Sequence, residues 1–218
     1  MIFDKHIFLL RHGETVLNAK HIRQNSTGEL SDSGREQARR AGERLKSFKI
    51  KKMISSPFER TIETSNIVAG ILGLEYSLSD LLVERRNPSE IVGRSYEDPV
   101  TIQIINFIDK SFHDPNARYS DEENFTDMKY RAIALKKYLE EKAIDNTLCV
   151  SHGIFLKMFL SVVLVGDNLS ISDYVKLSVY NTADNAAISL ITYNPIKKFF
   201  GQNPWKILAY NDTSTLPT

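Results

Sequence analysis

Apolar residues follow two patterns along this chain, short continuous runs and longer stretches with a helical period. Short runs bounded by polar residues predict buried strands, and apolar positions three and four apart predict helices that cover a sheet. Strands are therefore expected at residues 2–10, 52–55, 74–79, 147–151, 175–180, 187–193 and 206–210. Helices are expected at about 33–48, 57–72, 124–141 and 153–165, with a helix-like piece at 102–108.

Some of these helices also carry end signals. Ser33 and Glu36 have the spacing of a capping box at the start of the first helix. Pro57 suits a first helical turn, and Gly73 suits a carboxyl cap.

Strands and helices alternate through most of the chain. This alternation predicts an α/β fold, a three-layer α/β/α sandwich whose central sheet is mostly parallel, with antiparallel strands added late. We expect one domain over residues 1–210 and a flexible tail at 211–218. The irregular stretch at about 80–121, with its three prolines, is expected to form a lid or pocket wall, because long loops in compact domains are often functional.

The composition is that of an ordinary soluble globular protein, with 42% hydrophobic and 25% charged residues among 218. The formal net charge of +1 argues against a broad basic surface for nucleic acid. The single cysteine, Cys149, falls in an apolar run and is expected to be a buried thiol in a reducing compartment. The longest apolar stretch, 154–165, is interrupted by Lys157 and is too short to span a membrane.

The amino-terminal apolar run is also too short for the core of a signal peptide. A cytoplasmic protein without a membrane partner is therefore expected. No pattern in the sequence specifies an oligomeric state.

The segment Arg11-His12-Gly13-Glu14-Thr15 directly follows the first apolar run. Open α/β sheets place their ligand sites at the carboxyl ends of strands. A guanidinium binds two phosphate oxygens at once, and a neutral imidazole can attack phosphorus. Taken alone, the segment fits a surface turn that contains a histidine equally well.

Arg60 falls in the first turn of the helix that Pro57 opens. Free backbone N–H groups at that end of a helix favour an anion, so a cation there suggests a bound negative partner. The alternative is a surface arginine paired with Glu59 or Glu63.

Two later segments also place reactive side chains after apolar runs. His152-Gly153 repeats the order of strand, histidine, glycine and helix, which makes coincidence less plausible than for one such pair. Glu84 follows an apolar run and precedes Arg85 and Arg86, a pattern that alone fits a solvated loop better.

Together these segments resemble the histidine phosphatase superfamily, the group that includes cofactor-dependent phosphoglycerate mutases. The resemblance extends from residue 11 to residue 153, and the expected fold covers nearly the whole chain. The matching segments are Arg11-His12-Gly13-Glu14-Thr15 with Asn18, Leu30-Ser31-Asp32-Ser33-Gly34 with Gln37 and Ala38, Ser55-Ser56-Pro57 with Arg60 and Thr64, Glu84, and Ser151-His152-Gly153.

The resemblance implies a nucleophile and an acid. His12 would attack phosphorus and form a phosphohistidine that water later hydrolyses, with its Nδ1 held by an acceptor for which the Gly13 carbonyl is one candidate. Glu84 would protonate the leaving oxygen and then deprotonate the attacking water. Glu14 and Glu90 are alternative candidates for the acid.

The resemblance also implies a set of phosphate-binding groups whose charges surround the phosphoryl oxygens. This set consists of Arg11, Arg60, His152, Gly153 and Asn18. No metal or other cofactor is expected, because the arginines take the place of a divalent cation. The remaining histidines, His6, His21 and His113, have no ligand-like spacing.

Two departures from the family pattern narrow the branch. Ile154 stands where acid phosphatases and phytases of the superfamily have an aspartate, which favours Glu84 as the acid. Leu17 stands where the mutase branch typically has tryptophan, and Glu84-Arg85-Arg86-Asn87-Pro88 replaces a Glu-Arg-His-Tyr-Gly run, which speaks against mutase activity.

Loop residues are expected to recognise the rest of the substrate. Arg23 and Arg85, together with Arg86 and Arg94, could bind a second phosphate or a carboxylate, or could face water. Four aromatic residues could line a pocket or fill a core beneath it: Tyr96, Phe107, Phe112 and Tyr119.

The main hypothesis is therefore a phosphomonoester hydrolase that acts on a small phosphorylated metabolite through a phosphohistidine on His12. A phosphoglycerate mutase-type phosphotransferase is the alternative. A third hypothesis is a non-catalytic domain that binds phosphorylated ligands, but a binding module needs neither a nucleophile nor an acid.

Overall fold

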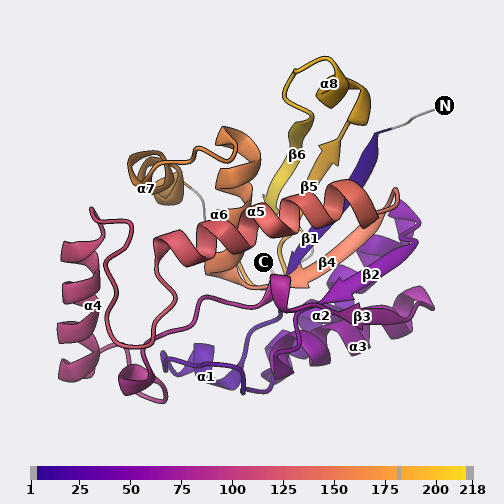
Figure 1. The fold of residues 1–218 in the computed structure, drawn as a ribbon. Helices are drawn as coiled ribbons and strands as arrows, with labels where there is room; N and C mark the ends of the chain where they lie inside the picture. Colours follow the sequence, from indigo (N-terminus) through magenta and orange to yellow (C-terminus); the bar gives the residue numbers. More distant parts are fainter. Residues whose placement is uncertain (1–3, 181–182, 215–218) are drawn as a thin grey trace.

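A single six-stranded sheet organises the chain in the computed structural model, which describes residues 4–180 and 183–214. The strand order is β3-β2-β4-β1-β5-β6 (Figure 1). The first four strands in this order are parallel: β3 (Tyr76–Leu78), β2 (Lys52–Ser55), β4 (Thr147–Ser151) and β1 (Lys5–Arg11). β5 (Ile188–Tyr193) and β6 (Trp205–Asp212) add in antiparallel orientation, so a mostly parallel sheet with late antiparallel strands is confirmed.

Helices precede or follow most strands. The α-helices are α1 (Val16–Ala19), α2 (Asp32–Leu45), α3 (Glu59–Leu72), α4 (Pro99–Ser111), α5 (Phe125–Lys142), α6 (Gly153–Val165), α7 (Ile171–Tyr180) and α8 (Pro195–Phe199). Three short 3₁₀ helices occur at η1 (Lys46–Phe48), η2 (Asp80–Leu82) and η3 (Ser89–Ile91).

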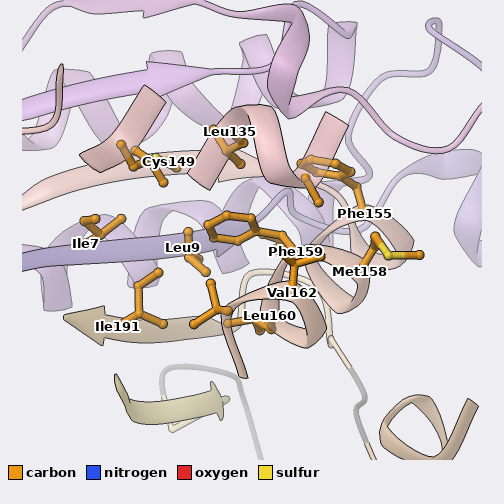
Figure 2. Packing of buried hydrophobic residues seen from close by; sticks show 14 of the residues in the cluster. Ile7, Leu9, Leu135, Cys149, Phe155, Met158, Phe159, Leu160, Val162 and Ile191 are labelled. Atoms are coloured by element: carbon orange, nitrogen blue, oxygen red, sulfur yellow. The ribbon is translucent and has the colours of Figure 1, made fainter. Parts of the chain in front are cut away.

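Two hydrophobic clusters divide the helices between the faces of the sheet. Successive strand residues point to opposite faces, so Leu9 packs with α5 and α6 while Phe8 and Leu10 pack with α2 and α3. Figure 2 shows Phe159 and Val162 of α6 lying over the strands beside Leu9 and Ile191. These clusters confirm the expected three-layer α/β/α sandwich.

The structure corrects the expected strand at 175–180, which belongs to helix α7. Apolar and polar residues alternate in this segment, as in a half-buried strand, but Tyr174 just before it is buried against Phe112 and Phe125. Ser170 accepts a hydrogen bond from the backbone N–H of Asp173, which begins a helical turn. Tertiary packing of one aromatic residue therefore outweighs the local pattern.

Two expected element ends are also corrected. Ser31, rather than Ser33, caps α2 by accepting from the backbone N–H of Gly34. The last strand extends to Asp212, so the expected tail from residue 211 includes part of β6, and residues 215–218 lie outside the described part of the chain.

The irregular stretch at 80–121 contains η2, η3 and α4. Asp98 caps α4 and Pro99 occupies its first turn, so this helix is longer than the expected piece at 102–108. Ile91, Ile104 and Ile108 form a small cluster separate from the two sheet cores. Figure 1 shows α4 standing apart from the sheet, at the left of the view.

None of the described helices has the length and apolar character needed to cross a bilayer.

The loop after β1 packs directly against the start of α2. A Cβ on Gly13 would lie 2.3 Å from the carbonyl oxygen of Gly34, and a Cβ on Gly34 would lie 1.9 Å from that of Glu14. Real side chains cannot approach backbone so closely, so both positions require glycine. This contact fixes the segment that carries His12.

A Gly34→Ala substitution is therefore expected to lower the free energy of unfolding by about 2 kcal/mol or more, because one backbone must move. Gly70→Ala in α3 is the matched control, since its Cβ would meet nothing within 4 Å. The control should be neutral or stabilising by up to about 1 kcal/mol. Urea unfolding followed by circular dichroism measures both, and equal effects of the two substitutions would contradict the packing argument.

Candidate active site

A cavity of about 330 Å³ lies at the carboxyl ends of β1 and β4. These strands are neighbours in the sheet, with Arg11 opposite Ser151, so the segments that follow them meet at one edge. The cavity is lined by Arg11, His12, Asn18, Arg23, Gln24, Arg60, Glu84, Asn87, Tyr96, Gly153, Ile154, Lys157, Ala183 and Asp184. The structure therefore gathers most of the expected site residues in one place.

The imidazole of His12 is held in one tautomer. Its Nδ1 lies 2.7 Å from the carbonyl oxygen of Gly13, the acceptor considered in the sequence analysis. Its Nε2 lies 3.2 Å from Nε of Arg60, which can only donate. Nδ1 therefore carries the proton, and Nε2 keeps the lone pair with which it accepts from Arg60.

Arg60 connects His12 with His152. Its Nε also donates to Nδ1 of His152 at 3.1 Å, and Nε2 of His152 lies 2.8 Å from the hydroxyl of Ser56. The two imidazole rings are 5.2 Å apart. His152 is fully buried, so it supports the cavity from behind Arg60.

Burial and positive neighbours keep both histidines neutral. The pKa of His12 lies well below its usual value, first because the ring is desolvated and then because Arg60 and Arg11 repel a proton. The same causes lower the pKa of His152. Burial also lowers the pKa of Arg60 to about 10, which still leaves it charged at neutral pH.

Arg11 contributes a second cation to this cavity. One of its terminal nitrogens donates to the carbonyl of Ala183 at 2.5 Å, whereas its buried Nε has no partner among the described residues. A Cβ on Gly153 would lie 3.3 Å from that Nε, so the glycine leaves room for the guanidinium.

Glu84 closes the cavity at the start of α6. Its carboxylate accepts hydrogen bonds from the backbone N–H groups of Ile154 at 3.1 Å, Phe155 at 2.9 Å and Arg85 at 2.8 Å. The carboxylate thus satisfies free donors of the first helical turn and is fixed in position.

Asn18 and Arg23 line the remaining wall. The side-chain oxygen of Asn18 accepts from the backbone N–H of Thr15 at 3.3 Å, which forms part of the capping box of α1. Arg23 stacks on the ring of Tyr96, 4.3 Å from its centroid.

Arg85, a member of the expected set, does not line the cavity. Its guanidinium forms an ion pair with Glu122, a carboxylate that is 2% exposed, and donates to the carbonyl of Glu123. A buried carboxylate requires a cation as its partner, and Arg85 neutralises the charge of Glu122.

The other loop candidates also lie outside the cavity lining. Arg86 donates to the carbonyl of Asp121, and Arg94 is paired with Asp98 at the surface. Of the alternative acids, Glu14 accepts from the hydroxyl of Ser31, and Glu90 is exposed. Neither is a lining residue.

Sequence reasoning missed Lys157 and Asp184 as lining residues. Lys157 is the only charged residue of the apolar helix α6 and lies one turn after Gly153, so helical spacing could have placed it on the cavity side. Asp184 precedes β5 without any local signal. Partial burial lowers the pKa of Lys157, and Asp184 acts in the opposite direction.

Across residues 4–180 and 183–214, no cluster of three or more histidine, cysteine, aspartate or glutamate side chains is arranged to hold a metal ion.

Fold and cavity define an α/β protein whose sheet edge presents a neutral imidazole, backed by a second, and two largely buried guanidinium groups to an anion. Phosphate is the anion that this combination of groups suits best. The sequence matches the histidine phosphatase superfamily (branch 1) over residues 7–211, and the chain belongs to this superfamily of phosphatases and mutases.

Similar proteins differ in their named activities. The probable phosphoglycerate mutase GpmB of Salmonella arizonae is 30% identical over 167 residues, covering 72% of this chain and 74% of that protein. YhfR of Bacillus stearothermophilus has a TM-score of 0.81 at 21% identity, covering 98% of this chain and all of the other. A mycobacterial glucosyl-3-phosphoglycerate phosphatase has a TM-score of 0.77 at 18% identity, covering 96% of this chain and all of the other. The two structures show a shared fold.

The neutral histidines predict a pH effect on stability. Because their pKa values are lowered in the folded state, the unfolded chain binds more protons below its histidine pKa of about 6.5. Stability is therefore complete above about pH 6.5 and should fall as the pH is lowered, by up to about 1.4 kcal/mol per pH unit for each ring.

Urea unfolding between pH 8 and pH 5, without phosphate, measures this slope. His12→Gln should reduce it, whereas His113→Gln, an exposed site that leaves both buried rings in place, should retain it. If the free energy of unfolding of the wild type does not decrease as the pH is lowered from 6.5, the assignment of neutral rings is contradicted.

Proposed function

We propose that this chain is a phosphomonoester hydrolase that acts on a small phosphorylated metabolite through a phosphohistidine formed on His12. The observation that carries the proposal is the hydrogen bonding of His12. Its Nδ1 donates to the Gly13 carbonyl, and its Nε2 keeps the lone pair and accepts from Arg60, one of the two arginines that line the cavity with His12. A neutral, oriented imidazole is the form that can attack phosphorus.

Arg11 and Arg60 supply the charge that such a reaction needs. Negative charge spreads over the phosphoryl oxygens in the transition state, and two guanidiniums already fixed at the site stabilise it without reorganisation. The unpartnered Nε of Arg11 can donate to those oxygens, and Arg60 lines the same cavity with its positive charge. In this scheme the arginines do the work of a divalent cation, so the reaction requires no metal.

Glu84 is the proposed acid and base. In the first step Nε2 of His12 forms a bond to phosphorus, the P–O bond to the leaving group breaks, and the protonated Glu84 gives its proton to the leaving oxygen. In the second step water attacks phosphorus, its proton returns to Glu84, and the P–N bond breaks to release phosphate. The three backbone donors that fix the Glu84 carboxylate support this role, because proton transfer depends on position.

The mutase alternative is favoured by one observation, the 30% identity to a probable phosphoglycerate mutase. A mutase must hold its phosphohistidine away from water and return the phosphoryl group to a bound product. Leu17 and the Asn87-Pro88 pair depart from the mutase pattern, and Asn87 lines the cavity itself. Hydrolysis is therefore the proposed outcome.

His12→Ala should abolish phosphate release from an aryl phosphate measured with EDTA present. The wild type should also form an acid-labile, base-stable phosphoenzyme in a rapid quench with labelled substrate, and the variant should not. His113→Ala is the matched control and should retain activity, because His113 is exposed and does not line the cavity.

A parallel assay with 3-phosphoglycerate and its bisphosphate separates the two functions. Isomerisation without net phosphate release would establish the mutase instead. Tight phosphate binding with no turnover of any ester would refute both enzymatic functions.

Glu84→Gln should lower kcat about 10²- to 10⁴-fold on an alkyl phosphate, whose leaving oxygen needs a proton. The loss should be far smaller on p-nitrophenyl phosphate, whose leaving group departs as an anion. Glu90→Gln, at an exposed site outside the cavity lining, serves as control. Full activity of Glu84→Gln on the alkyl phosphate would reject the acid assignment, and equal losses on both substrates would indicate a structural role at the start of α6.

A further inference from the structure

Arg23 is a cavity-lining cation whose side chain has no polar partner among the described residues. Its Nε is buried and has no hydrogen bond, and its guanidinium forms no ion pair with any described residue. The neighbouring loop arginines differ in this respect: Arg85 pairs with Glu122, Arg94 pairs with Asp98, and Arg86 donates to a backbone carbonyl. A partly buried guanidinium with free donors is a site that lacks its acceptor.

The backbone of Arg23 is fixed by contacts with the irregular stretch at 80–121. Its N–H donates to the carbonyl of Arg94 at 2.8 Å, and its carbonyl accepts from Gly93 at 2.8 Å. Tyr96 donates in turn to the carbonyl of His21 at 2.8 Å, next to a bridge between Ile22 and Ser95. The loop at 21–24 and the segment 93–96 therefore act as one unit, which places the guanidinium before any ligand arrives.

The stack on Tyr96 orients the donors. A guanidinium that lies flat on an aromatic ring keeps its in-plane N–H groups free for an anion. Partial burial lowers the pKa of Arg23, and the charge of Arg85 lowers it further. Tyr96 and Asp109 have the opposite effect, but Asp109 forms no ion pair with Arg23. The surroundings thus leave positive charge uncompensated at this wall.

The charged residues that line the cavity differ in whether an anionic partner is accounted for. Arg11 and Arg60 together match the two negative charges of a phosphoryl group. Lys157 also lines the cavity; burial and then Arg11 act to lower its pKa, and Glu84 and Asp184 act to raise it without forming an ion pair among the described residues. Arg23 differs from Lys157 in that its buried Nε has no hydrogen-bond partner among the described residues.

We propose that Arg23, positioned by Tyr96, binds a second anionic group on the substrate. This inference rests on the proposed function and specifies its substrate class: phosphomonoesters whose alcohol portion carries a carboxylate or a second phosphate. The phosphoryl group to be transferred occupies the His12 end, and the second anion reaches across the cavity to Arg23.

Equilibrium binding tests the site without any turnover. We would measure the affinities of alkyl phosphonates with two to five methylene groups that end in a methyl, a carboxylate or a second phosphonate. At the best chain length, a terminal anion should tighten binding to the wild type about tenfold or more. The carboxylate and phosphonate arms show which of the two anions the site prefers.

Variants assign the effect to Arg23. Arg23→Met should remove the preference for a terminal anion, and Arg23→Lys should restore only part of it, because an ammonium lacks the planar fork. Tyr96→Leu should weaken the preference for a terminal anion, and Tyr96→Phe, which keeps the ring under the guanidinium, should restore it, as expected of a positioning residue. Arg94→Met, which removes a nearby surface guanidinium, is the matched control and should behave as wild type.

The outcomes separate this inference from the proposed function. The second site would be refuted if a terminal anion gave no gain in affinity at any chain length. It would also be refuted if Arg23→Met lost affinity equally for methyl-terminated and anion-terminated ligands. A preference that survives in Arg23→Met would also overturn it. Absence of phosphate release by a wild type that still shows the Arg23-dependent preference would refute hydrolysis while retaining the second site.

Discussion

The guanidinium of Arg60 is buried between two imidazoles, and the rest of the site is arranged around that contact. Arg60 as a residue is 2% exposed, and its Nε lies 3.2 Å from Nε2 of His12 and 3.1 Å from Nδ1 of His152. A buried cation is unfavourable unless its donors are satisfied, and both rings accept from it only when they are neutral. The same contact therefore selects the charge state of both histidines and the tautomer of His12. A phosphoryl group would supply the negative charge that the contact lacks.

The parts of this site come from distant segments, and backbone contacts bring them together. The Gly13–Gly34 approach holds the loop after β1 against α2, and the carboxylate of Glu84 is fixed by the first N–H groups of α6. One partner in each contact is a backbone group, the Gly34 carbonyl in the first and the N–H groups of Ile154 and Phe155 in the second, so the positions of this loop and of Glu84 depend on the backbone of α2 and α6. Small shifts there would move His12 or Glu84 relative to phosphorus.

Much of this arrangement could be predicted from the sequence, because its signals are local. The apolar runs before His12 and His152 place both residues at strand ends, and parallel neighbours bring these ends together. Arg85 and Arg23 could not be separated in this way. Arg85 pairs with Glu122, 37 residues away. Arg23 is placed at the cavity by backbone hydrogen bonds with segment 93–96. Helix α7 likewise depends on the packing of Tyr174, which the alternation of apolar and polar residues in this segment does not reveal.

In the proposed function, residues at the ends of the sheet strands bind the phosphoryl group, and residues of the loops bind the leaving group. Arg11, Arg60 and His152 are held by the sheet edge and its helices, where burial leaves little freedom for substitution. Arg23 and Tyr96 belong to loops joined through backbone hydrogen bonds, which persist when side chains change. Substitutions there can alter the alcohol that is accepted without disturbing the charge around phosphorus. A chain with this construction can share its chemistry with mutases and phosphatases while its substrate is set by a few loop residues.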